Sequence, residues 1–371
     1  MFECNLNYTK EYEQFTNLVL TKYGMFSQAA EREAMYLANK GNRAARYAYA
    51  DLIFFGKITV PSPYEKAFFQ YLQAADIAID ESGNLKCGKE GVPQAFAMLG
   101  YYFYNYKRDG YVKSCETIEG MERAGKGSLE ERIRIALELS SSSLQYVKMP
   151  IAINLIGRIL DEVSKSEELY LALKNDITAM VDETSFFELS APAVKITNCA
   201  TCSDASDFYY NEAAKCGYVY ACNNLASREA DTIIKLCARE IEGGKSESEV
   251  TREPSCEIKN HIEKYVQYLK MSAEKYEPYA ANRLGLFYII GEIRSGRLKK
   301  KYNFRSFCDS ALAKESFVTA TMYPNKNSAW AYYNLLKHFP KDYNMNIDLM
   351  NEHMDCIKRL DPEVYDLAIE D

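Results

Sequence analysis

One stretch of the sequence comes close to a phosphate-binding loop. GMERAGKGS, residues 120–128, has the glycines and lysine of that motif, but Gly127 occupies the place of the Ser or Thr and Ser128 comes one residue late. A phosphate loop needs strand, turn and helix in that order so that backbone amides converge on the anion, and the preceding KSCETIE makes a poor buried strand. We therefore predict a turn that ends a helix here.

Four cysteines form the next group whose chemistry could matter: Cys199, Cys202, Cys216 and Cys222. Four thiolates can close a tetrahedral zinc site, and the Cys-x-x-Cys spacing is also that of a redox dithiol. However, Cys216 and Cys222 fall on or beside predicted helices and are six residues apart, which places them on poorly matched helical faces. Buried or idle thiols are the simpler interpretation, so we predict no metal and no cofactor and leave zinc binding open.

Histidines and paired carboxylates do not form a recognisable acid–base site. His261, His338 and His353 belong to different predicted helices, without a local Ser, Cys or carboxylate that would make one of them a general base. Glu130–Glu131 and Glu167–Glu168 are typical of charge on a helix surface, because paired catalytic carboxylates need a cleft. We therefore expect no enzyme.

A seven-residue step recurs along the chain and indicates an internal repeat. It joins small residues at the end of one segment to an alanine in the next: Leu37–Ala38 to Ala45, Ala213–Ala214 to Ala221, and Ser272–Ala273 to Ala280. The following segment has a large apolar residue and a small residue at offsets four and five, as in Leu284 and Gly285. Small side chains let two helices approach closely, so each unit is predicted to be an antiparallel helix pair.

The segments KAFFQYLQAA, YYNEAAKCGYVYA and AANRLGLFYIIG resemble the SEL-like subclass of tetratricopeptide repeats, in which an A-x-x-x-L-G-x-x-Y-x-x-G helix lies beside a K-A-x-x-x-Y-x-x-A-A helix. The better-defined copies cover 29–105 and 205–295, the middle part 107–200 is degenerate, and 309–371 is predicted to hold capping helices. The resemblance implies an all-α, right-handed α/α superhelical solenoid of about six degenerate helix pairs, forming one domain over 1–371.

Repeat starts at Ala45, Ala95, Ala152, Ala221, Ala280 and Ala329 are 50, 57, 69, 59 and 49 residues apart, which is longer than the usual unit of the family. Inserted loops or extra helical turns are therefore expected, and the turn-rich segments 76–94 and 242–255 are the candidate loops. Either loop could itself be a recognition element. Helices are predicted over 9–23 and 27–40 as an opening pair.

A row of polar residues suggests a binding surface. Asn154, Asn223 and Asn282 occupy offset two of their units, and Asn224 and Arg283 occupy offset three. Stacked repeats place equivalent positions side by side, so the amides could bind the backbone of a partner segment and Arg283 a carboxylate. The alternative interpretation is that these residues cap or bridge neighbouring helices. Under the binding hypothesis, replacing Asn223, Asn282 and Arg283 together weakens binding without lowering the melting temperature.

The net charge of −7 argues against a nucleic-acid-binding surface. The one dense basic stretch, Arg297 to Arg305, is predicted to be a solvated loop, with an anion-contacting patch as the alternative. No segment resembles a signal peptide or a membrane span, and the eleven scattered cysteines are typical of reduced thiols, so a cytoplasmic protein is expected.

Taken with the resemblance, these features predict a non-catalytic scaffold or adaptor that binds a partner protein or peptide along a concave surface, without nucleic acid or membrane. The alternative is a regulatory sensor, in which the same groove binds a small peptide or ligand and controls an effector. The sequence leaves the partner and the oligomeric state open.

Overall fold

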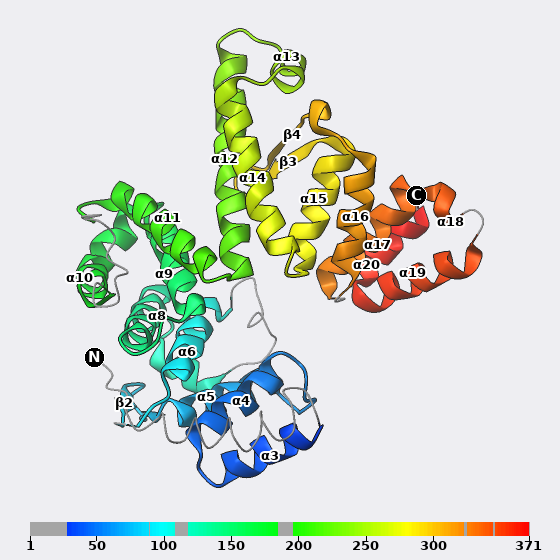
Figure 1. Ribbon diagram of the computed structural model, residues 1–371. Coiled ribbons are helices and arrows are strands. Elements are labelled where there is room, and N and C mark those ends of the chain that lie inside the picture. The colour runs from blue at the N-terminus through cyan, green and yellow to red at the C-terminus, as the bar shows by residue number, and fades with distance from the viewer. Residues whose placement is uncertain are drawn as a thin grey trace. The chain divides into compact units, whose positions relative to one another are not determined.

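The structure is a computed structural model that describes residues 28–88, 90–107, 118–184, 196–322, 325–343 and 346–370. The chain divides into two compact units, Met1–Ala213 (unit 1) and Ala214–Asp371 (unit 2), which are described separately below (Figure 1). The helix predicted over 9–23 lies outside the described residues, whereas the one predicted over 27–40 corresponds to α3.

The described residues of unit 1 form helices and one short antiparallel hairpin. Its elements are α3 (Gln28–Asn39), α4 (Arg43–Phe54), α5 (Pro63–Ala74), β1 (Ile77–Ile79), β2 (Leu85–Cys87), α6 (Pro93–Asn105), α7 (Glu119–Ala124), α8 (Leu129–Leu144), α9 (Pro150–Val163), α10 (Glu167–Thr184) and α11 (Cys199–Lys215), which ends across the boundary with unit 2.

Unit 2 is also a helical array with one hairpin. Its elements are α12 (Val219–Glu242), α13 (Glu247–Arg252), α14 (Cys256–Ala273), α15 (Pro278–Ile290), β3 (Glu292–Ser295), β4 (Lys300–Asn303), the 3-10 turn η3 (Arg305–Phe307), α16 (Ser310–Thr321), α17 (Lys326–His338), α18 (Pro340–Tyr343), α19 (Ile347–Leu360) and α20 (Pro362–Glu370).

The expected helix pairs are present. In the described residues the two helices of a pair contact each other in α3–α4, α5–α6, α8–α9, α14–α15 and α16–α17, and successive pairs also pack together. The helices α11 and α12 are joined by the same seven-residue step, from Ala213–Ala214 to Ala221. The prediction of an α/α repeat fold is therefore confirmed, and its right-handed superhelical path stays a prediction. The structure differs from an all-α chain in its two hairpins, each of which fills an insertion between helices.

Glycines at the predicted contact position do bring helices close together. A methyl group placed on Gly100 would lie 2.8 Å from the Ser140 hydroxyl of α8, and one placed on Gly285 would lie 2.4 Å from the Phe317 ring of α16. A methyl group placed on Gly157 would lie equally close, 2.8 Å, to the Tyr210 ring of α11. Any side chain at these positions would push the helices apart, which explains why the motif carries glycine.

Turn and loop predictions can be compared directly with the structure. The phosphate-loop-like segment is a turn between α7 and α8, with Ser128 as the N-cap of α8, so the prediction of a helix-ending turn is confirmed. The segment predicted as a loop over 76–94 contains β1 and β2, whose register pairs Ile77 with Cys87. The loop over 242–255 contains the short helix α13, which starts with a capping box at Ser246.

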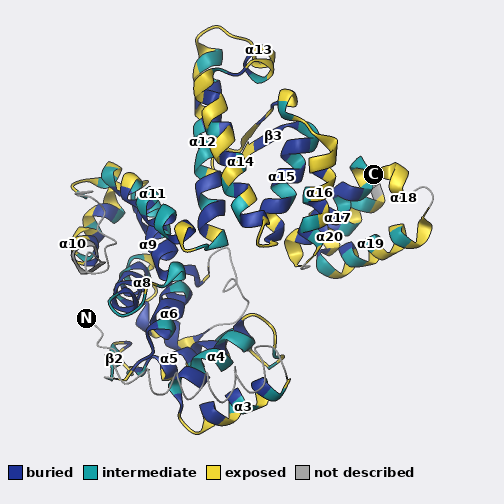
Figure 2. Ribbon diagram, in the orientation of Figure 1, coloured by how far each residue is buried: buried dark blue, intermediate teal, exposed yellow. Residues whose placement is uncertain are grey.

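Figure 2 shows where buried positions lie along the helices, and several of the buried residues are tyrosines. Several of these tyrosines are fully buried, so that their hydroxyls do not reach water. Tyr102 donates to the Tyr64 carbonyl at 3.0 Å, and Tyr106 donates to Glu122 at 2.9 Å. Tyr71 donates to the Asp51 carboxylate at 2.5 Å. Burial of a phenol is tolerated here because each hydroxyl finds a partner inside the protein.

The C-terminal helices cover α17. Ile357 of α19 and Val364 of α20 are buried against Ala329 and Tyr332. Ile357 is the residue that α19 buries fully, and Met354 and Leu360 pack against the same cluster from partly buried positions, whereas Met350 is exposed.

Candidate functional site

Two of the predicted amides bond to the next helix pair of unit 2. Asn223 of α12 donates from Nδ2 to the Glu277 carboxylate at 3.0 Å, and Glu277 also accepts from the backbone N–H of Ala280 at the start of α15. Asn282 of α15 accepts from Nδ2 of Asn334 on α17 at 2.9 Å. These bonds are those of the bridging interpretation, in which amides tie one pair to the next.

Arg283 is similarly engaged, and its side chain is only 11% exposed. Its guanidinium donates to the Tyr265 hydroxyl at 3.3 Å and to the Arg294 carbonyl at 2.8 Å, and lies 3.9 Å from the Glu292 carboxylate. Burial lowers the pKa of Arg283, but Tyr265, Tyr279 and Glu292 raise it, and the net change is upward. The carboxylate that this arginine addresses in the structure therefore belongs to its own chain.

The remaining two residues have different surroundings. Asn154 is buried in α9 of unit 1, whereas Asn224 is half-buried in α12 of unit 2, and both make contacts within the protein. A binding row through all five residues stays a prediction. Because Asn223, Asn282 and Arg283 hold unit 2 together, replacing all three is now expected to lower its stability as well as any binding.

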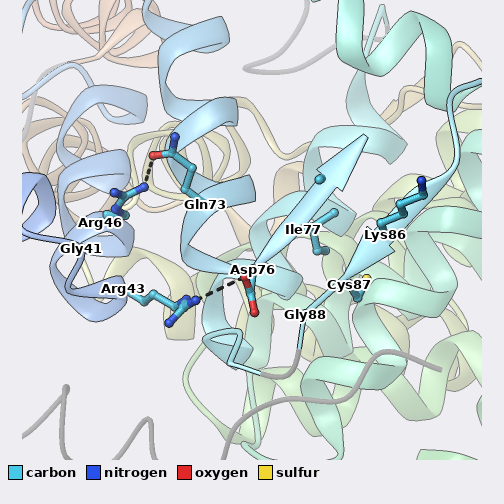
Figure 3. Close-up of a pocket in the computed structure, with 10 residues that line it drawn as sticks. Gly41, Arg43, Arg46, Gln73, Asp76, Ile77, Lys86, Cys87 and Gly88 are labelled. Atoms are coloured by element: carbon cyan, nitrogen blue, oxygen red, sulfur yellow. Dashed lines mark hydrogen bonds and ion pairs between the residues drawn. The ribbon is translucent and has the colours of Figure 1, made fainter. Parts of the chain in front are cut away.

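A pocket of unit 1, which the sequence analysis missed, offers a more accessible site. It has a volume of about 530 Å³ and lies between the start of α4, the end of α5 and the β1–β2 hairpin. Figure 3 shows arginines of α4 on one side of this pocket and hairpin residues on the other. The polar side chains that line it are Arg43, Arg46, Gln73, Asp76 and Lys86.

Charge pairs hold the two sides of the pocket in place. Arg43 contacts Asp76 at 3.3 Å and Glu90 at 2.6 Å, and the Glu90 side chain is 56% exposed. Burial lowers the pKa of Arg43, but its bonds to Glu90 and Asp76 raise it above the ordinary value. Arg46 donates to the Ala38 carbonyl at 3.0 Å and also to Gln73. Two guanidinium groups are thus fixed at the rim of one open cavity.

The backbone at Asp76 and Gly88, at the two ends of the β1–β2 hairpin, explains how Asp76 can face Arg43 of α4. Asp76 has a positive φ of 53°, and its backbone carbonyl accepts a hydrogen bond from the Gly88 backbone N–H at 2.7 Å. A methyl group on Gly88 would collide with the Asp76 carboxylate at 1.8 Å. Glycine is therefore required at this position for Asp76 to face Arg43.

The chemistry that this pocket supports is recognition of an anion. Guanidinium groups present forked donors that match carboxylate and phosphate oxygens. Burial raises the pKa of the Cys87 thiol to about 12, so Cys87 is a neutral thiol at pH 7 and not a nucleophile. The signal in the sequence was Arg43-x-x-Arg46 directly after Gly41, but nothing in the sequence indicated that Gln73 and the hairpin would lie opposite.

The cysteines and histidines considered in the sequence are engaged elsewhere. Cys202 is buried in α11 and Cys222 in α12, whereas Cys216 is exposed. His261 contacts Glu229 at 2.6 Å, and His353 packs against the Tyr332 ring at 4.7 Å. Among the described residues no group of three or more His, Cys, Asp or Glu side chains could hold a metal ion.

No protein-family model matches the sequence, and no curated protein matches it. Among solved structures, the chain is similar to a protective antigen present in uropathogenic Escherichia coli strains that displays an SLR fold. The similarity covers 97% of this chain and 90% of the antigen, at 14% sequence identity and a TM-score of 0.22, too low to support an argument about function.

The class of fold follows from the helix contacts of the chain itself: an α/α repeat array that resembles SEL-like repeats in its motif and in its small-residue contacts. No helix in the described ranges combines the length and the apolar composition needed to cross a bilayer.

Proposed function

We propose that this chain is a non-catalytic scaffold or adaptor that binds a partner protein or peptide. The observation that carries the proposal is the open pocket of unit 1, where Arg43 and Arg46 face the β1–β2 hairpin. An acid–base pair, a reactive thiolate or a metal cluster would favour an enzyme instead, and the pocket residues form an anion-recognition site.

The partner chemistry that fits this pocket is a carboxylate-bearing segment. Glu90 pairs with Arg43 from a largely exposed position, so a carboxylate of a partner can exchange with it at little cost in free energy. The Gln73 amide beside Arg46 adds a hydrogen-bonding group that can read a peptide backbone. The pocket would therefore bind an acidic side chain or a C-terminal carboxylate together with neighbouring backbone.

Capture of partners from a cell lysate on the immobilised full chain, followed by mass spectrometry, tests this function. We expect a protein that the wild type retains and that Arg43→Gln/Arg46→Gln loses by at least tenfold, because both donors to its carboxylate are gone. The control Lys57→Gln/Lys66→Gln removes the same charge from exposed positions of unit 1 and should retain the protein.

Two outcomes would contradict the proposal. If Arg43→Gln/Arg46→Gln retained the captured protein as well as the wild type does, with an unchanged melting temperature, the pocket would not be the partner-binding site. Capture of no protein, together with a small molecule released from the purified wild type on denaturation, would favour the regulatory sensor.

A further inference from the structure

A second surface, in unit 2, carries an independent inference. The β3–β4 hairpin packs against α12 and α15, and its register pairs Ile293 with Tyr302 and Arg294 with Lys301 (Figure 1). This hairpin corresponds to the basic stretch of the sequence. It is a structured element, so the prediction of a solvated loop describes only the turn between its strands.

The hairpin is fixed to the helices by buried contacts. Ile293, Tyr302 and Phe304 are at most 1% exposed and belong to the core of unit 2. The Ser295 hydroxyl in β3 donates to Asp231 of α12 at 2.5 Å and accepts from the Leu298 backbone N–H at 2.8 Å. A partner that binds here meets a preformed surface and does not have to order it.

One edge of the hairpin has unpaired backbone groups. The N–H of Phe304 donates to the Gly291 carbonyl at 2.8 Å, in the same register as the strand pairs. Because hydrogen-bonded and non-bonded pairs alternate in an antiparallel ladder, Lys301 and Asn303 are in non-bonded pairs. Their backbone N–H and C=O groups therefore point away from β3. No other segment of the described chain hydrogen-bonds to these groups.

The same edge is strongly basic. Residues 292–305 hold six basic residues and one acidic residue, although the whole chain has a net charge of −7. Glu292 pairs with Arg294 at 2.7 Å and with Lys301 at 3.1 Å. The other cations of the stretch are exposed, and in the described part of the chain no carboxylate lies within 4.0 Å of Lys299, Lys300 or Arg305.

Neighbouring charge selects among anionic partners. Helix α13 contacts η3 and carries the exposed carboxylates Glu247 and Glu249 beside this stretch. A long polyphosphate chain would meet these carboxylates and the negative charge of the protein, whereas a short acidic peptide can stay on the strand edge. Charge and backbone together therefore favour an extended peptide.

We propose that the open edge of β4 binds an extended acidic segment of a partner protein by strand addition. Lys301 and Asn303 supply backbone hydrogen bonds to the added strand, and Lys299, Lys300 and Arg305 attract its carboxylates. This surface lies in unit 2 and does not depend on the pocket of Arg43 and Arg46, so either proposal can fail without the other.

Fluorescence anisotropy with a labelled ten-residue peptide of alternating Glu and Val tests the proposal on the full chain. We expect this peptide to bind, and a Lys–Val peptide of equal length not to bind. Lys301→Pro should weaken binding at least tenfold, because proline removes an N–H that points outward and leaves the backbone hydrogen bonds between β3 and β4 intact. Lys299→Gln/Lys300→Gln should weaken it about threefold or more and flatten its salt dependence.

Controls separate binding from folding and from total charge. Lys259→Gln/Lys264→Gln changes two exposed lysines of α14 and should leave the affinity unchanged. The fluorescence of Trp330, the single tryptophan, verifies that unit 2 remains folded in each variant.

Three results would overturn the proposal. Unchanged affinity of a folded Lys301→Pro protein would exclude strand addition. Tighter binding of a single-stranded oligonucleotide than of the Glu–Val peptide would make nucleic acid the ligand. Binding of neither probe would indicate that the lysines instead keep the exposed edge of β4 from pairing with strands of other chains.

Discussion

Replacing Gly285 by valine is expected to lower the free energy of unfolding of unit 2 by about 3 kcal/mol. A single added carbon at this position would lie 2.4 Å from the ring of Phe317, which is itself fully buried. The helices α15 and α16 would have to separate, and the contacts between two helix pairs would weaken. Urea denaturation followed by Trp330 fluorescence measures this loss.

Gly296→Ala is the matched control for this substitution. Gly296 lies in the turn of the β3–β4 hairpin, and a methyl group placed there would meet nothing within 4 Å. Its effect should stay within about 0.5 kcal/mol. If Gly285→Val were as stable as the wild type, close approach through small residues would not be what holds successive helix pairs together.

Replacing Asp51 by asparagine is expected to stabilise unit 1 at pH 8 by about 2 kcal/mol and to have little effect at pH 4. Burial raises the pKa of Asp51 from 3.8 to about 6, although bonds from Tyr71 and Tyr47 partly oppose the shift. The folded protein therefore holds this proton more tightly than the unfolded chain. The stability it contributes is present below pH 4 and is lost as the pH rises through 6.

Urea denaturation followed by circular dichroism at several pH values between 4 and 8 tests this prediction. Asparagine keeps an acceptor for the Tyr71 hydroxyl and removes the charge, so the pH dependence between 4 and 7 should become shallower. Glu81→Gln changes an exposed carboxylate and should leave the profile as it is in the wild type. A variant that is less stable than the wild type at pH 8 would show that the ionised carboxylate is stabilising.

The repeat fold could be predicted from the sequence because the residues that define it recur periodically. Small residues such as Gly100 and Gly285 recur at one offset, and a helix contact needs them there wherever it occurs. The insertions at 76–94 and 242–255 were predicted as interruptions of this period, whereas the segment of the β3–β4 hairpin was predicted only as a loop. The β1–β2 hairpin was not predicted, because its strands have three residues each, too few to establish an alternating pattern.

The candidate site could be predicted from the sequence far less well than the fold. Asn223 and Asn282 share one offset of the repeat, but the sequence does not state which partner an amide will have, and the structure gives them Glu277 and Asn334. The pocket of unit 1 depends on side chains far apart in the sequence, such as Arg46 and Gln73, that tertiary packing brings together. No local sequence motif indicates that these distant side chains will lie together.

Hydrogen–deuterium exchange of the full chain, free and in complex with a captured partner, tests the central claim that this repeat protein acts by docking. The account predicts slowed exchange over residues 76–88, where the β1–β2 hairpin borders the pocket, and a partner that is recovered chemically unchanged. Unaltered exchange over 76–88, or a partner converted to a product during incubation, would contradict it.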